Sequence, residues 1–119
     1  MERNNRALDV VHAYHDAWTS GDYDAAGTYL AEDLKTEVPI NHYDSKASFL
    51  AAVRGFGQAV TDIDLLASLG GPDEAMLLYD LDVKAIGKLR VAEHFTVRDG
   101  AITRIRHVHD TAALIAAGL

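Results

Sequence analysis

The chain contains no cysteine, which excludes a disulfide framework, a thiolate nucleophile and a cysteine-ligated metal site. It is also short of positive charge: 11 Lys and Arg residues stand against 18 Asp and Glu residues, a net charge of −7. This balance argues against a nucleic-acid partner and against an anionic membrane surface, because both require clustered basic side chains. No apolar run approaches the roughly 20 residues of a membrane span. We therefore expect a cytoplasmic protein with no nucleic-acid and no membrane partner.

Other sequence signals of specific chemistry are missing too. There is no Gly-rich phosphate loop, no Walker pattern and no nucleophile elbow. What is present is a chain of 119 residues, 49% of them apolar, with ordinary glycine content. That is enough to build one globular domain, 1–119, around a core.

The first half of the chain has the patterning of helices. Residues 4–19 form an expected helix with one buried stripe at three- and four-residue steps, made of Ala7, Val11, Tyr14 and Trp18. Gly21 would end it, and Asp22 can cap a second helix that runs to about residue 31. A short strand, 34–38, should follow. Asp44 or Ser45 then caps a third helix whose apolar face is Phe49, Leu50, Val53 and Phe56.

The second half alternates between apolar and polar residues, which is typical of strands. Strands are expected over 60–69 and 77–84, and a closing hairpin over 91–110. Helices followed by a strand meander predict an α+β domain, with three N-terminal helices packed on a strongly curved antiparallel sheet. Such a sheet encloses a cone, whose mouth is the natural place for a ligand pocket.

The closing hairpin carries ionisable residues on what we interpret as its inner face. Asp99-Gly100 is expected to form the tight turn, because this pair tolerates positive φ angles. Glu93 would then share a face with apolar neighbours, and His107 and His109 would lie on the matching face of the last strand. A carboxylate rarely goes inside without a partner or a function.

These observations define a candidate site. The expected catalytic residues are Tyr14, Glu93, His107 and His109, and the expected substrate-binding residues are Trp18, Tyr79, Phe95 and Phe56. A carboxylic acid kept neutral by an apolar site, or a tyrosine hydroxyl, can donate a hydrogen bond to a developing oxyanion. A neutral imidazole is the commonest general base. This chemistry requires neither a metal nor a cofactor.

Each residue also has a plainer interpretation. Tyr14 has the spacing of a core residue, and Glu93 could pair with Arg90 or Arg104 at a sheet edge. His107 and His109 could form an exposed or dimer-facing row. Two histidines so spaced on a strand can ligate zinc, but no third ligand is evident, and we expect no metal site.

Three stretches resemble a known superfamily: residues 13–22 with 29–39, the helix that begins near Ser45, and the hairpin 92–102. They are similar to the superfamily of nuclear transport factor 2, ketosteroid isomerase, scytalone dehydratase, limonene epoxide hydrolase and the SnoaL-like polyketide cyclases. The resemblance implies a helix-covered conical sheet, a homodimer and a pocket for a small apolar molecule. It specifies the fold more than the activity, since the fold hosts enzymes and non-enzymes.

By this resemblance, Tyr14 matches the oxyanion-hole tyrosine of the ketosteroid isomerases and Glu93 matches their protonated aspartate, which is a worked example of a neutral buried carboxyl. The isomerase base, however, is replaced by Val38, and Glu37 should point to the opposite face of its strand. His107 or His109 could take over as base. The resemblance thus implies a cofactor-independent isomerase, cyclase, dehydratase or epoxide hydrolase that acts on a small carbonyl or polyketide-like molecule. The alternative is a non-catalytic ligand-binding or dimerisation domain.

The protonation of Glu93 is a separate expectation. If Glu93 is buried among apolar side chains, desolvation should raise its pKa, so that part of the population is protonated near neutrality. A charged histidine nearby would oppose that shift, and the two groups would titrate as a coupled pair.

Overall fold

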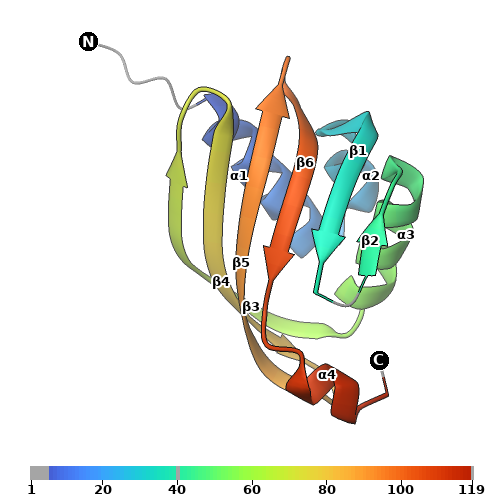
Figure 1. Cartoon of the computed structure of the whole chain (residues 1–119). Helices are drawn as coiled ribbons and strands as arrows, with labels where there is room; N and C mark the ends of the chain where they lie inside the picture. The colour runs from blue at the N-terminus through green and yellow to red at the C-terminus, as the bar shows by residue number, and fades with distance from the viewer. Residues whose placement is uncertain (1–5, 40, 119) are drawn as a thin grey trace.

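The computed structural model describes residues 6–39 and 41–118. In chain order its elements are α1 (Arg6–Thr19), α2 (Tyr23–Thr28), β1 (Leu30–Val38), β2 (Asn41–Tyr43), α3 (Lys46–Gly57), β3 (Val60–Gly70), β4 (Glu74–Val83), β5 (Gly87–Arg98), β6 (Ala101–Val108) and α4 (Ala112–Ala116). The three helices α1, α2 and α3 lie on one side of a single curved sheet (Figure 1). This confirms the α+β class. The first two residues of the predicted helix, 4 and 5, lie outside the described residues.

The sheet has six strands in the order β2-β1-β6-β5-β4-β3. The strands β3, β4, β5 and β6 form the expected antiparallel meander, and β2 folds back on β1. The pairing of β1 with β6 is parallel, which the sequence-based picture of an antiparallel sheet did not include. The last long strand therefore lies in the middle of the sheet, beside the first (Figure 1).

Several boundaries differ from expectation for local reasons. The second helix ends at Thr28 instead of about residue 31, because the Tyr29 carbonyl accepts a hydrogen bond from the Ile102 amide at 2.8 Å. This contact starts β1 earlier than predicted, at Leu30. The third helix is capped by Ser45, one of the two candidates, whose Oγ accepts from the Ser48 amide at 3.1 Å. The short elements β2 and α4 were not predicted.

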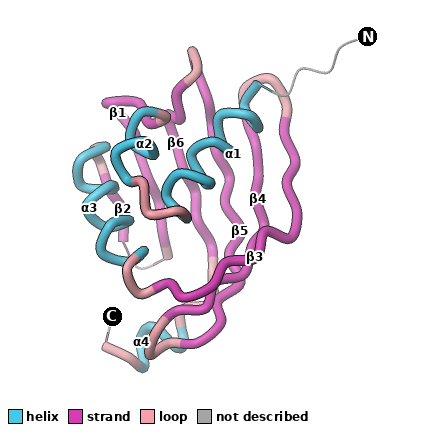
Figure 2. Tube along the Cα trace, turned by 180° about the vertical axis from the view of Figure 1, so that it is seen from behind, coloured by secondary structure: helices cyan, strands magenta, loops and turns pink. Residues whose placement is uncertain are grey.

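Helix α1 lies against the concave face of the sheet (Figure 2), and its apolar stripe is buried. The stripe is buried as expected, with His15 added to it. Tyr14 meets Phe95 of β5 edge to face, with ring centroids 6.1 Å apart. None of the described helices is long and apolar enough to cross a membrane.

The approach of α1 to the edge strand β3 depends on a glycine. A Cβ built on Gly70 would lie 2.6 Å from the Leu8 Cβ, whereas a Cβ on the neighbouring Gly71 meets nothing within 4 Å. Helix backbone and strand are both rigid here, so neither can easily move aside. Gly70 thus lets α1, and with it Tyr14 and Trp18, lie close against the sheet.

We expect Gly70→Ala to lower the free energy of unfolding by roughly 1–3 kcal/mol, the usual cost of overpacking. Gly71→Ala is the matched control and should change it by no more than about 0.5 kcal/mol. Urea unfolding followed by circular dichroism measures both. Equal effects of the two substitutions would contradict this account of the contact.

Candidate active site

The site begins with the register of the β5–β6 hairpin. Asp99 and Gly100 adopt φ angles of 53° and 78°, the positive values expected for the tight turn. With the turn fixed there, Glu93 pairs directly with His107 across the two strands. Side chains of directly opposed residues on one face are close neighbours. The hairpin therefore brings a carboxylate and an imidazole together on the concave face.

Glu93 is buried, with 4% of its surface exposed, and both of its carboxylate oxygens accept hydrogen bonds. The Tyr79 hydroxyl donates to Oε1 at 2.6 Å, and His107 Nδ1 lies 3.1 Å from Oε2. Nδ1 is the donor in this pair when Glu93 is ionised, which leaves Nε2 of the neutral ring as its acceptor. The alternative partners of Glu93 are excluded, because Arg90 and Arg104 instead pair with Asp80 and Glu37.

The ionisation of Glu93 differs from the sequence-based expectation. Burial raises the pKa of its carboxyl, as predicted, but the hydrogen bonds from His107 and Tyr79 and the nearby imidazoles outweigh burial and hold the pKa below its ordinary value. Glu93 is thus a carboxylate near neutral pH. In the ionised form it accepts hydrogen bonds and donates none, so its contacts favour a carboxylate over the expected neutral oxyanion-hole acid.

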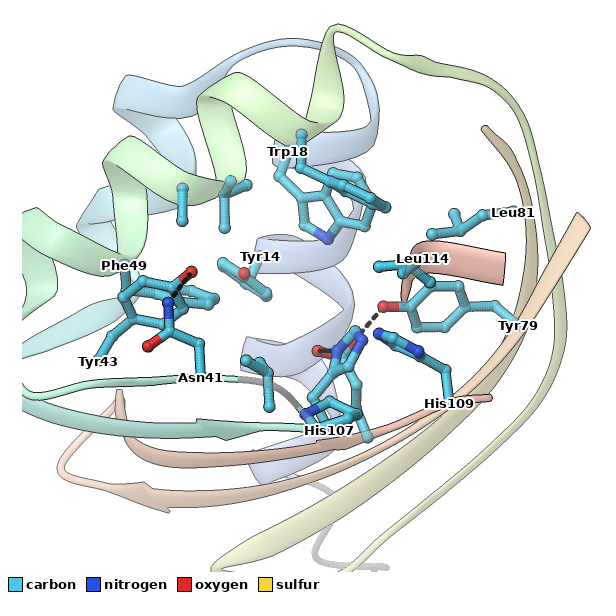
Figure 3. Close-up of a pocket in the computed structure, with 16 residues that line it drawn as sticks. Tyr14, Trp18, Asn41, Tyr43, Phe49, Tyr79, Leu81, His107, His109 and Leu114 are labelled. Atoms are coloured by element: carbon cyan, nitrogen blue, oxygen red, sulfur yellow. Dashed lines mark hydrogen bonds and ion pairs between the residues drawn. The ribbon is translucent and has the colours of Figure 1, made fainter. Parts of the chain in front are cut away.

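The two tyrosines have different environments. Burial, followed by the nearby Glu93 charge, raises the pKa of both Tyr14 and Tyr79 well above the ordinary value, so both stay protonated. The Tyr79 hydroxyl is engaged with Glu93. The Tyr14 hydroxyl points into the open space between α1 and the sheet (Figure 3), and no described residue hydrogen-bonds it. Tyr14 is therefore a donor available to a ligand.

These groups face a cavity of about 220 Å³ between α1, α3 and the sheet. Its walls are mainly apolar and aromatic (Figure 3), and consist of Tyr14, Trp18, Val38, Pro39, Asn41, Tyr43, Phe49, Ala52, Val53, Phe56, Tyr79, Leu81, Glu93, His107, His109 and Leu114. Seven of the eight predicted site residues are among them. The exception is Phe95, which is fully buried behind Tyr14 and does not line the cavity.

His109 lies beside His107 in the cavity, with ring centroids 5.0 Å apart and the planes nearly perpendicular. Its Nδ1 donates to the Asp110 carbonyl at 2.9 Å, so its Nε2 also remains for a ligand. Of these two histidines, only His107 has a carboxylate partner among the described residues. Among the described residues no group of three or more His, Cys, Asp or Glu side chains is arranged to hold a metal ion.

Sequence reasoning missed the part of the wall that comes from irregular or short segments. Asn41 and Tyr43 belong to the three-residue strand β2, and Leu114 reaches the cavity from α4. Such short elements have no periodicity that could be recognised. Phe49 was recognised as part of an apolar helix face, but not as a wall of the cavity.

A buried histidine, His15, lies behind this site. Its ring packs edge to face against Trp18 and at a tilt against Tyr79, with ring centroids at 5.6 Å and 4.9 Å. Its Nδ1 is buried and has no hydrogen-bond partner in the described chain. Burial lowers the pKa of His15, although Glu93 and Asp16 oppose that shift. The folded state thus favours the neutral ring.

This predicts a pH-dependent stability. Below a pH of about 6.5 the unfolded chain takes up a proton at His15, whereas the folded state resists protonation there. The contribution of His15 to the free energy of unfolding is therefore complete above that pH and declines as the pH falls. The free energy of unfolding should therefore fall more steeply from pH 8 to pH 5 in the wild type than in His15→Phe. His42→Gln, at an exposed histidine, should keep the wild-type slope. Identical slopes in all three proteins would contradict a depressed pKa.

Comparison with known proteins agrees with this architecture. The SnoaL-like domain family matches residues 11–105. A protein from Kribbella flavida has 32% identity and a TM-score of 0.89 over 94% of this chain and 93% of its own. A putative polyketide cyclase from Sinorhizobium meliloti has 24% identity and a TM-score of 0.76, over 84% and 94%. An epoxide hydrolase from M. tuberculosis similar to limonene epoxide hydrolase has 19% identity and a TM-score of 0.76, over 93% and 87%.

No curated protein sequence matches the chain significantly. The family match nevertheless spans most of the chain, and the fold described above is shared with nuclear transport factor 2-like structures. The chain belongs to the SnoaL-like domain family, and its fold is that of nuclear transport factor 2-like structures.

Proposed function

We propose that the chain is a cofactor-independent acid–base enzyme that acts on a small apolar carbonyl compound, with His107 as its general base. The observation that carries this proposal is the Glu93–His107 pair, 3.1 Å apart and open to an apolar cavity. A carboxylate that accepts from one ring nitrogen fixes the tautomer of a histidine and stabilises the imidazolium that forms, as in hydrolase triads. Val38, at the position that resembles the base of the isomerases, cannot accept a proton, so the proposed base lies on the last strand.

The proposed step is proton abstraction beside a carbonyl group. The Nε2 lone pair of His107 takes a proton from the carbon next to the carbonyl, and the C–H electron pair forms the C=C bond of an enolate while the C=O electrons move to oxygen. Glu93 stabilises the resulting imidazolium, and the Tyr14 hydroxyl donates to the enolate oxygen. Return of the proton from Nε2 to a different carbon completes an isomerisation. In a dehydration the enolate electrons re-form the carbonyl and make a new C=C bond, while a β-hydroxyl group takes the proton from the imidazolium and leaves as water.

The wall of the cavity sets the class of substrate. Its residues include no lysine or arginine, so it offers no fixed cation for a carboxylate or phosphate group. The volume of about 220 Å³ lies below the roughly 300–1,000 Å³ of common ligand pockets. We therefore infer a neutral molecule of one or two rings. The neighbours described as a polyketide cyclase and an epoxide hydrolase suggest cyclisation and hydrolysis as related reactions.

Exchange of acidic C–H protons with deuterated solvent tests the proposed step without knowledge of the substrate. With 2-tetralone as probe, the wild type should accelerate exchange over buffer, and His107→Gln should lose about 10²–10⁴-fold of that acceleration. Tyr14→Phe should lose about 10²–10³-fold, as oxyanion donors do. Glu93→Gln should also be impaired, because the amide can present the wrong group to Nδ1.

The matched controls remove an imidazole and a tyrosine hydroxyl at positions outside the cavity. His42→Gln and Tyr29→Phe alter a histidine and a tyrosine outside the cavity wall and should leave exchange unchanged. Exchange that survives in His107→Gln would refute the assignment of the base. If 2-naphthol binds to the cavity but the wild type accelerates no exchange, the non-catalytic ligand-binding domain becomes the better account. The homodimer and the cytoplasmic location stay predictions from the sequence.

A further inference from the structure

Stabilisation of an oxyanion in this cavity requires donors, and Glu93 cannot be one of them. Both of its oxygens already accept, from Tyr79 and His107, and its pKa is held low by those contacts. Tyr79 is committed to Glu93. Of the donors expected from the sequence, this leaves only Tyr14. A single hydrogen bond offsets little of the hydration free energy that an anion loses when it is buried.

Trp18 offers a second donor. It follows Tyr14 by four residues on α1, so the two side chains lie on the same face, about 6 Å apart along the helix axis. The indole nitrogen of Trp18 points into the cavity (Figure 3). The side chain is only 7% exposed, and none of the described residues accepts a hydrogen bond from its N–H.

The orientation of the indole is fixed by its neighbours. His15 meets it edge to face at 5.6 Å, and Tyr79 lies against it at 6.4 Å. These contacts hold the ring before a ligand arrives, and preorganised donors stabilise charge without a reorganisation cost. An indole N–H can only donate, so an unpaired one inside an apolar cavity is matched by an acceptor on a ligand.

We propose that the Trp18 Nε1–H and the Tyr14 hydroxyl together form a two-donor binding site for the oxygen of a small enolate or phenolate. Trp18 is then a ligand-binding residue and not only an apolar wall. The inference rests on the proposed function in placing the ligand in the same cavity, but it requires binding alone and no turnover.

The chain has one tryptophan, so a ¹⁵N-labelled sample gives one indole N–H signal. The probe is 2-naphthol, with 2-methylnaphthalene as the control, because the methyl group has nearly the shape of the hydroxyl but accepts no hydrogen bond. We expect 2-naphthol to shift the indole proton downfield and 2-methylnaphthalene to bind with a much smaller shift. No binding of 2-naphthol, or equal shifts with the two ligands, would overturn the inference.

Substitution of Trp18 measures how much its N–H contributes to the affinity for the ligand. Trp18→Phe keeps an aromatic wall but removes the donor, and it should weaken 2-naphthol by about three- to tenfold, the usual contribution of one hydrogen bond. Binding of 2-methylnaphthalene should change much less. Phe56→Leu, which trims the wall without removing a donor, should weaken both ligands alike. If Trp18→Phe also weakens both ligands alike, Trp18 is only a wall.

The outcomes separate this inference from the proposed function. Proton exchange that depends on His107, with no selective indole shift, would refute the role of Trp18 and leave the enzyme proposal intact. A selective shift in a protein that accelerates no exchange would support the anion site and refute the enzyme proposal.

Discussion

A charged carboxylate at the bottom of an apolar cavity is the constraint on which the rest of this site depends. An isolated buried carboxylate is too costly to keep, so it must be supplied with hydrogen-bond donors. Glu93 receives one from Tyr79 on the neighbouring strand β4 and one from His107 on β6. Each partner is fixed by strand pairing, so the sheet itself supplies the donors. The contact that helps keep Glu93 ionised also orients the His107 ring.

The sequence was most informative where one local rule fixed a long-range contact. The Asp99-Gly100 turn sets the hairpin register, and alternation along β5 and β6 then places Glu93 opposite His107. The helical stripe of α1 similarly placed Tyr14 and Trp18 against the sheet. In both cases the local sequence pattern and the need to bury one apolar face predict the same structure, and such agreement makes a prediction reliable.

What could not be predicted depends on tertiary contacts or on a balance of energies. The parallel pairing of β1 with β6 joins segments far apart in sequence, and nothing local signals it. Asn41 and Leu114 reach the cavity from elements too short to show a period. The sequence predicted that burial would raise the pKa of Glu93 and that a nearby charged histidine would oppose this shift, but it could not give the number and direction of the hydrogen bonds that decide the balance. Phe95 was assigned to the correct face of its strand, but it is covered by Tyr14 and does not reach the cavity.

The central position of β6 has a consequence for how the chain folds during synthesis. Strand β1 leaves the ribosome well before its parallel partner β6, which follows the four other strands of the sheet in chain order. Until then the edge of β1 that faces β6 is an unpaired strand edge, which is prone to wrong pairing. Contacts of such large sequence separation also slow folding, because a long loop must close before they form. The assembly of the cavity is therefore a late event, completed when the strand that carries His107 inserts between β1 and β5.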